Sequence, residues 1–301
     1  MSKNQQMTEQ QMKQNKQNQT LRGAEGFDLY YRNIFSERWD TLKEELLKES
    51  EPVSYNLDKG LNLRTYFLDA ASIYAAMSLP VKGAREILDL CAAPGGKTLV
   101  LASLMDSDAK LTSNERSFER KMRLVKVCDE HMPESVRSRI TVTCSDGSLW
   151  CRKKSECYDR ILLDAPCSSE RHVLNDKKYL DQWSPSRIKT LSMEQWALLS
   201  SACRLLKKGG YLVYSTCALA PQENDQVVSR LFKKFDDVEP VNKEDSEYKE
   251  IQNEYDKIKL FSPDFTIPAA EKTEFGYQIL PDSSNGSGPI YFSIIRKKTA
   301  E

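Results

Sequence analysis

The sequence predicts an α/β protein built on a mostly parallel sheet that helices cover on both faces. Between residues 85 and 235, short apolar runs of strand length alternate with longer runs of helical period. Glycines follow the first apolar run and open the helix after it, as in the ligand-binding turns of such sheets. Near the C-terminus, 277–280 and 289–297 flank a loop rich in Gly, Ser and Asn and predict a closing antiparallel hairpin.

The individual elements follow from these patterns in chain order. Strand patterns occupy residues 85–90, 110–115, 139–146, 158–166 and 211–217. Helical patterns occupy residues 95–105, 117–132, 192–210 and 224–235, and the third helix is expected to end at its two glycines. Because helices separate most of these strands, the strands are expected to lie parallel and to be buried on both faces.

The part of the chain before residue 81 has a different character. Residues 1–22 are rich in Gln, Asn and Lys and predict a disordered tail. Apolar residues of helical period cover 27–48, residues 50–64 are predicted to be irregular, and 65–79 predict a helix buried on most sides. We therefore expect an N-terminal helical extension over 23–80 and one main domain over 81–301, as the length of 301 residues allows.

Composition limits the function classes. Lys plus Arg and Asp plus Glu each number 44, which argues against a nucleic-acid partner unless charge is segregated along the chain. It is segregated, because 116–126 are mostly basic and 236–256 mostly acidic. No apolar run is long enough to span a membrane, and the N-terminal residues lack the apolar core of a signal peptide. The eight cysteines form no CxxC pair and only two histidines are present, so we expect no metal site and a location in the reducing cytoplasm.

A glycine turn and the acidic residues at the ends of the strands are predicted to surround one ligand. The turn DLCAAPGGKT, residues 89–98, lies between the first strand and its helix, where the backbone can approach a ligand. The next three strands end in Glu115, Asp146 and Asp164. Carboxylates in these places suit a nucleoside-type ligand with hydroxyls and an exocyclic amine. The alternatives are a plain strand–helix turn and, for each acid alone, a helix N-cap.

Two cysteines follow the fourth and fifth strands. Cys167 and Cys217 are expected to face the same cleft as the glycine turn, because these two strands are neighbours in a doubly wound sheet. The alternative is that each is a small core residue, as we expect for Cys128 and Cys203 on helices. A thiol, a carboxylate and a nucleoside-type cofactor together suit methylation of carbon 5 of a pyrimidine. Thiolate addition to carbon 6 makes carbon 5 nucleophilic, and an acid near ring nitrogen 3 stabilises the adduct.

Three motifs resemble one enzyme family in sequence, order and spacing. CAAPGGKT, LLDAPCSSERH and YSTCALAPQEND resemble the Nop/Sun (RsmB/Nop) family of RNA cytosine-5 methyltransferases, over roughly residues 60–298. TYFLDAAS and GPIYFSIIRK are most similar to the branch of the mitochondrial rRNA and tRNA members. The resemblance implies a Rossmann-like class I S-adenosylmethionine-dependent methyltransferase fold. It also implies Cys217 as the nucleophile, Cys167 as an aid to product release and Asp164 as a contact of the cytosine.

The resemblance further assigns the cofactor contacts. The residues that match the S-adenosylmethionine contacts of the family are Cys91, Ala92, Ala93, Pro94, Gly95, Gly96, Lys97, Glu115, Arg120, Asp146 and Asp164. Two positions depart from the family pattern: Asp225 stands where Glu is frequent, and Glu115 stands where Asp is frequent. Both departures keep the negative charge.

RNA is the partner that the resemblance implies, with rRNA expected first and tRNA as the alternative. The target base has to leave its stack or lie in a loop. Nearby cationic and polar residues either line the mouth of the site or form a solvated face; they are Arg171, His172, Lys177 and Lys178. We expect a monomer that acts on RNA, on an assembled ribosomal subunit or with a helper protein, and neither a membrane nor a metal as a partner.

Two other function classes stay open at this point. A methyltransferase that acts on DNA or a small molecule would not need both cysteine motifs. A non-catalytic RNA-binding factor would not need the full set of cysteines and strand-end acids.

Overall fold

The protein is described by a computed structural model over residues 21–58, 63–242 and 245–299, without the side chains of 246–253. Its described part contains a nine-stranded sheet of order β5-β4-β3-β6-β7-β11-β10-β9, with β8 paired to β11. The parallel strands are β3 (Glu86–Asp89), β4 (Lys110–Glu115), β5 (Ile140–Cys144), β6 (Tyr158–Asp164) and β7 (Leu206–Thr216). The strand order reverses between β3 and β6, which places a ligand-binding crevice at the carboxyl ends of these strands. The predicted α/β fold class is confirmed.

The C-terminal strands close the sheet in the antiparallel direction. β11 (Ile290–Lys297) pairs with β7 and with β10 (Tyr277–Ile279), so the predicted hairpin is confirmed. Two short strands extend this edge: β8 (Val238–Pro240) pairs with β11, and β9 (Glu271–Lys272) pairs with β10.

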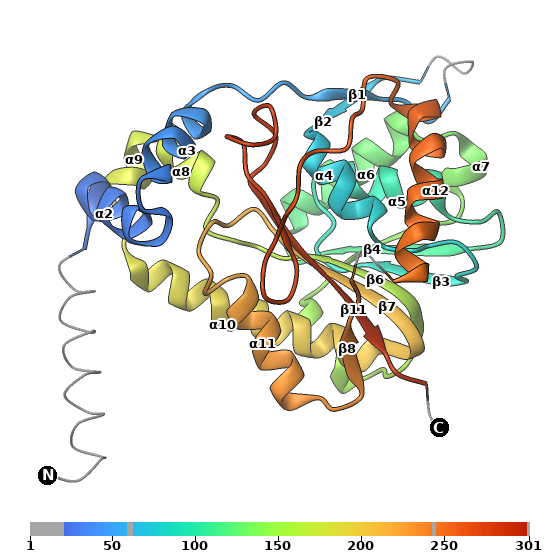
Figure 1. Ribbon diagram of the computed structural model, residues 1–301. Helices are drawn as coiled ribbons and strands as arrows, with labels where there is room; N and C mark the ends of the chain where they lie inside the picture. Colours follow the sequence, from blue (N-terminus) through green and yellow to red (C-terminus); the bar gives the residue numbers. More distant parts are fainter. Residues whose placement is uncertain (1–20, 59–62, 243–244, 300–301) are drawn as a thin grey trace, which may run out of the picture.

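Helices cover both faces of the sheet (Figure 1). One face is covered by α4 (Ala70–Met77), α5 (Gly96–Leu104), α6 (Phe118–His131) and α12 (Ser246–Phe261). The other face is covered by α10 (Pro185–Leu205), α11 (Asp225–Lys234) and the 3-10 helix η1 (Gly147–Arg152). Successive β6 residues alternate between the two apolar clusters, with Leu162 in the first and Ile161 and Leu163 in the second. This alternation is the period of a strand buried on both sides.

The N-terminal helices form a third apolar cluster beside the carboxyl ends of the strands. The helical pattern of 27–48 is two helices, α2 (Gly23–Phe35) and α3 (Arg38–Leu47), because the chain turns at Ser36 with φ 52°. Buried Phe27, Tyr31 and Trp39 pack there with Trp183 and with the small helices α8 (Glu170–Asn175) and α9 (Lys177–Asp181). The N-terminal helices α2 and α3 therefore share one core with α8 and α9, which follow Cys167 in the chain.

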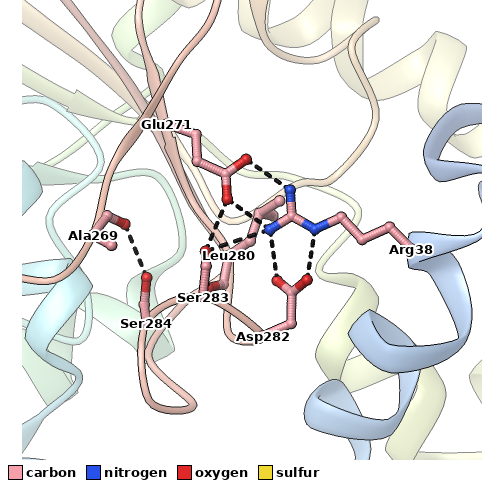
Figure 2. A network of polar contacts seen from close by, with 7 residues as sticks. All are labelled: Arg38, Ala269, Glu271, Leu280, Asp282, Ser283 and Ser284. Atoms are coloured by element: carbon pink, nitrogen blue, oxygen red, sulfur yellow. Dashed lines mark hydrogen bonds and ion pairs between the residues drawn. The ribbon is translucent and has the colours of Figure 1, made fainter.

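A polar network joins α3 to the C-terminal part of the chain (Figure 2). Arg38 Nε donates to Asp282 Oδ2 at 2.6 Å, and Arg38 Nη1 donates to Glu271 Oε2 at 2.7 Å. Both hydrogen bonds are charge-assisted, and Glu271 also accepts from Ser283 Oγ at 2.8 Å. Segments more than 230 residues apart in sequence are thus held together, since the two partners of Arg38 lie 233 and 244 positions away.

Two predictions near the N-terminus were wrong in part. Residues 50–64 contain β1 (Val53–Tyr55), and the helix predicted for 65–79 begins as β2 (Tyr66–Leu68). The two strands pair antiparallel, as their aromatic and β-branched residues favour. Asp69 then caps α4, because its carboxylate accepts from Ala71 N at 2.7 Å. The domain limits at residues 22 and 80 stay predictions, and residues 1–20 of the predicted tail lie outside the described residues.

The observed limits of α10 and β7 differ from the predicted ones, because tertiary contacts set them. α10 begins at Pro185, a residue that suits the first turn of a helix, and ends at Leu205 rather than at the glycines. The segment Leu206–Gly210 belongs to β7, where an irregularity in its register with β6 absorbs the two glycines. The acidic segment 236–256 contains β8 and most of α12. The sequence patterns did not predict these two elements or four short helices: α7 (Glu134–Arg137), η1, α8 and α9. A search of the described helices for one long and apolar enough to cross a membrane finds none.

Candidate active site

A cavity of about 660 Å³ opens at the carboxyl ends of the central strands. It brings together nine of the predicted site residues: Cys91, Ala93, Pro94, Glu115, Arg120, Asp146, Asp164, Cys167 and Cys217. A second cavity of about 130 Å³ shares Asp164 with it and is lined by Ala92, Gly96 and Lys97 as well as by Tyr66 and Ser72. Among the predicted catalytic and cofactor-binding residues, only Gly95 lines neither cavity.

Gly95 has a packing role rather than a ligand-facing one. Its φ is +121°, and a Cβ there would lie 2.9 Å from Val127 Cγ1 and 3.1 Å from Leu124 Cδ1 of α6. A glycine is needed at this position because the turn lies directly against that helix. We expected both glycines to let the backbone approach a ligand; Gly96 lines the smaller cavity, whereas Gly95 packs against α6.

The acid at the end of β4 is joined to the glycine turn by an arginine. Glu115 is buried, accepts from Ser117 N at 2.9 Å and lies 3.2 Å from Arg120 Nη1. Arg120 Nη2 donates to Ala93 O at 2.7 Å. Arg120 is therefore held between the strand-end acid and the turn, and both of its neighbours line the cavity.

Asp146 is a helix N-cap, the alternative considered for it, and it also lines the larger cavity. Its Oδ1 accepts from Ser148 N at 2.9 Å and from Ser148 Oγ at 2.7 Å, so it is the N-cap of η1. It lines the same cavity as Cys91, Ala93 and Pro94 of the glycine turn. The hydrogen bonds described for Asp146 use only Oδ1, so Oδ2 could accept from a ligand.

An ion pair connects the end of β6 with the start of α5. Lys97 Nζ lies 2.8 Å from Asp164 Oδ2, and Ser215 Oγ donates to Asp164 Oδ1 at 2.8 Å. Burial favours the neutral amine of Lys97, but the Asp164 carboxylate outweighs burial, so the pKa of Lys97 is raised. Asp89 lies below this pair, where it accepts from Thr98 Oγ1 at 2.6 Å, and burial raises its pKa to about 7.

The two cysteines lie side by side, as predicted from the neighbouring strands. Cys217 N donates to Cys167 Sγ at 3.3 Å, and Ser169 Oγ lies 3.2 Å from Cys217 Sγ and 3.6 Å from Cys167 Sγ. Ser169 reaches both sulfur atoms because the chain turns there with φ 57°, a left-handed conformation uncommon outside glycine. The hydrogen bond with Cys217, together with burial, raises the pKa of Cys167 well above its usual value. By contrast, Cys128 and Cys203 are buried in the apolar clusters, as expected.

Two buried glutamates behind the cysteines were not identified from the sequence. Glu170 accepts from Leu219 N at 3.0 Å and from the hydroxyls of Tyr31 and Ser168. Glu223 accepts from Ser168 N at 3.0 Å and from Gln195 Nε2 at 2.7 Å. Burial raises the pKa of Glu170, and burial followed by the charge of Glu170 raises the pKa of Glu223 to about 7. Both acids lie within the two cysteine motifs, which is the one signal that the sequence offered.

The glutamates fix the loops that carry the thiols. Ser168, next to Cys167, is held by both carboxylates, and Leu219, two residues after Cys217, is held by one. Tyr31 of the N-terminal helix α2 reaches the same carboxylate across 139 positions of sequence. This buried cluster therefore joins the two cysteine loops to each other and to α2.

The residues expected at the mouth of the site have mainly structural contacts. Arg171 donates to Lys48 O at 2.9 Å and to Gly286 O at 2.8 Å, and burial lowers its pKa. Lys177 pairs with Asp181, and His172 packs against Tyr179. None of these residues, nor Lys178, lines either of the two cavities described above. In the described ranges, no group of three or more His, Cys, Asp and Glu side chains is arranged to hold a metal ion.

Comparison with known proteins identifies the family. Residues 76–292 match the family model of the 16S rRNA methyltransferase RsmB/F. The chain belongs to this RsmB/F family.

Relatives of the RsmB/F chain are named as methyltransferases of rRNA and tRNA. The 5-cytosine rRNA methyltransferase NSUN4 of Bos taurus is 31% identical over 231 residues, which cover 75% of this chain and 58% of the relative. The mitochondrial tRNA (cytosine(34)-C(5))-methyltransferase of Danio rerio is 32% identical over 77% of this chain and 60% of its own length. The ribosomal RNA small subunit methyltransferase F of Erwinia tasmaniensis is 37% identical over 59% of this chain and 37% of its length. The matches thus span about half the length of these relatives.

Solved structures agree on the fold. A methyltransferase homologue from Pyrococcus horikoshii covers 89% of this RsmB/F chain and 93% of its own, with a TM-score of 0.63 at 22% identity. NSun6 from Pyrococcus horikoshii, solved with SFG, covers 78% of this chain and 54% of its own, with a TM-score of 0.61 at 21% identity. The predicted Rossmann-like class I S-adenosylmethionine-dependent methyltransferase fold and the predicted family are both confirmed.

Proposed function

We propose that this chain transfers a methyl group from S-adenosylmethionine to carbon 5 of a cytosine in RNA through a covalent cysteine–cytosine adduct. The observation that carries the proposal is the pair of thiols at the ends of β6 and β7, which share one cavity with the glycine turn and three strand-end acids. The names of the relatives support RNA as the substrate, with rRNA first and tRNA second. Having both cysteines disfavours a DNA or small-molecule enzyme.

The residues around the larger cavity fit S-adenosylmethionine. Glu115 suits the ribose hydroxyls and Asp146 the adenine amine, because carboxylates accept from both kinds of donor. The turn from Cys91 to Lys97 is left to contact the methionine part, and the volume of about 660 Å³ is in the range of small-molecule sites. When bound, the cofactor supplies an electrophilic methyl group.

Cys217 is the proposed nucleophile. Its thiol gives up its proton to solvent, and its sulfur forms a bond to carbon 6 of cytosine. The electron pair of the C5–C6 double bond moves toward carbon 5 and the ring nitrogens. Asp164 contacts the base edge. The Lys97 ammonium, whose Nζ lies 2.8 Å from Asp164 Oδ2, supplies the positive charge that balances the electrons added to the ring. Carbon 5, now nucleophilic, accepts the methyl group.

Cys167 is the proposed base for release. In the free protein the pKa of Cys167 is raised first by its hydrogen bond with Cys217, then by burial and by the charge of Cys217. Once Cys217 is bonded to carbon, its thiol hydrogen bond and its charge no longer raise the pKa of Cys167, so Cys167 becomes a stronger acid than in the free protein. Cys167 releases its own proton to solvent and takes the proton from carbon 5. The C5–C6 double bond reforms, the C6–sulfur bond breaks, and its electron pair returns to Cys217.

Methyl transfer to purified RNA, followed by bisulfite sequencing, tests the proposal. Cys217→Ala is expected to abolish transfer, whereas Cys167→Ala is expected to form an adduct with RNA that survives denaturing electrophoresis. Cys144→Ala, at an exposed cysteine outside the cavity, is the matched control and should turn over normally. Normal turnover by Cys167→Ala would remove the two-thiol mechanism, and the absence of any modified cytosine in rRNA and tRNA would favour a non-catalytic RNA-binding factor.

A monomeric state, a cytoplasmic location and a ribosomal subunit as partner stay part of this proposal. Size-exclusion chromatography with light scattering, cell fractionation and co-sedimentation with ribosomal subunits test them one by one.

A further inference from the structure

A groove of about 650 Å³ lies on the far side of α10 from the active site. Helix α10 contributes to both surfaces, with Glu194, Ala197 and Leu198 in the active-site cavity and Lys189 and Trp196 in the groove. At 100° for each residue these two sets lie on opposite sides of the helix. The other walls of the groove are α2 and α11, as their positions beside α10 in Figure 1 show.

The groove is positively charged. Its lining holds the cations Lys189 and Arg230 and contains no Asp or Glu among the described residues. Both side chains are exposed, and no ion pair of either one is found in the described part of the chain. This local excess of positive charge stands out in a chain whose formal charge is zero.

The remaining lining has the chemistry that recognises unpaired bases. The Arg230 guanidinium lies over the ring of Trp196, 4.4 Å from its centroid, and Tyr30 offers a second ring. Flat aromatic and guanidinium groups stack on bases irrespective of sequence. Side-chain amides, which can both donate to and accept from base edges, come from Asn33, Gln222 and Gln226.

The groove is also connected to the catalytic loops. Gln222 belongs to the loop that follows Cys217, and the next residue is Glu223, which holds Ser168 beside Cys167. Helix α10, about 10 Å wide with its side chains, lines both the groove and the active-site cavity. An RNA strand that leaves the active site can reach the groove within a few nucleotides.

We propose that this groove binds an unpaired stretch of the same RNA that presents its cytosine to Cys217. The proposal rests on RNA being the substrate. Phosphates contact Lys189 and Arg230, while a base stacks against Trp196 or Tyr30. Because these residues do not touch the reacting atoms, the groove adds affinity and orients the strand without taking part in the chemistry.

Fluorescence anisotropy with a fluorescein-labelled oligouridine, titrated without cofactor at several salt concentrations, tests the groove. Lys189→Ala/Arg230→Ala is expected to weaken binding and to reduce the slope of log K against log salt by about 1.4, at about 0.7 for each lost phosphate contact on a single strand. The matched control is Lys110→Ala, which removes an exposed lysine at the amino end of β4, away from the groove. In methyl-transfer assays the double variant should raise KM for RNA and leave kcat at saturating RNA unchanged.

The outcomes separate this proposal from the proposed function. If the double variant binds the oligonucleotide with the affinity and salt slope of Lys110→Ala, or if the unaltered protein does not bind it, RNA is not the ligand and a protein partner becomes the occupant to test. Failure to methylate any RNA would refute the proposed activity, yet the anisotropy result would stand because it requires no turnover.

Discussion

Glu223→Gln is expected to make the stability of the protein less dependent on pH. Glu223 is fully buried, and burial followed by the charge of Glu170 raises its pKa from 4.5 to about 7. The folded protein therefore holds a proton on this carboxyl that the unfolded chain has already released. The stabilisation is complete below about pH 4.5 and is lost as the pH rises through about 7, so the free energy of unfolding falls over this window.

The size of the effect follows from the same shift. At about 1.4 kcal/mol for each pH unit, a rise in pKa from 4.5 to about 7 corresponds to roughly 3 kcal/mol, of which most is lost between about pH 5 and pH 8. A glutamine keeps an oxygen that accepts from Ser168 N and Gln195 Nε2 but does not titrate. Asp89, whose pKa burial also raises to about 7, remains and keeps a part of the pH dependence in the variant.

Urea unfolding at a series of pH values measures this difference. The unfolding free energy of Glu223→Gln should fall by roughly 2 to 3 kcal/mol less than that of the unaltered protein between about pH 5 and pH 8. Glu37→Gln, at an exposed position between α2 and α3, is the matched control and should behave as the unaltered protein. An unchanged loss of stability in Glu223→Gln would show that the buried carboxyl does not hold its proton in the folded state.

Three further substitutions test the packing around the site. Tyr31→Phe removes a buried donor to Glu170 and should lower the unfolding free energy by about 1.5–3 kcal/mol. It should also reduce kcat more than it changes KM, and kinetics equal to those of the unaltered protein would refute a positioning role. Arg38→Ala leaves Asp282, only 8% exposed, without its ion pair and should lower the urea midpoint by the equivalent of about 1–3 kcal/mol, an effect that an unchanged midpoint would contradict. Gly95→Ala places a residue with a side chain at a φ of +121° and directs its Cβ toward α6. Calorimetry should find about 1–3 kcal/mol of destabilisation, and a variant as stable as the unaltered protein would disprove the strain.

The local patterns of the chain were enough to locate the strands of the parallel sheet and the residues at their ends. Cys167, Cys217 and Asp164 could be placed together from the sequence because neighbouring parallel strands end at the same edge of a sheet. The pairing of β1 with β2 could not be predicted, because two strands of three residues have too short a pattern to distinguish them from the start of a helix. The limits of α10 and β7 depended on a register irregularity that only the paired strand β6 explains.

The sequence by itself determined the fold class and the family and indicated the candidate reactive residues, since periodicity and motifs depend on neighbours along the chain. Only the tertiary structure decided that Gly95 serves packing and that Ser169 lies between the two sulfur atoms. It also decided that Tyr31 reaches Glu170 across 139 positions and that α2 and α11 enclose a cationic groove with α10. These contacts join segments far apart in the chain, and their geometry depends on how helices and loops pack, which no local pattern encodes.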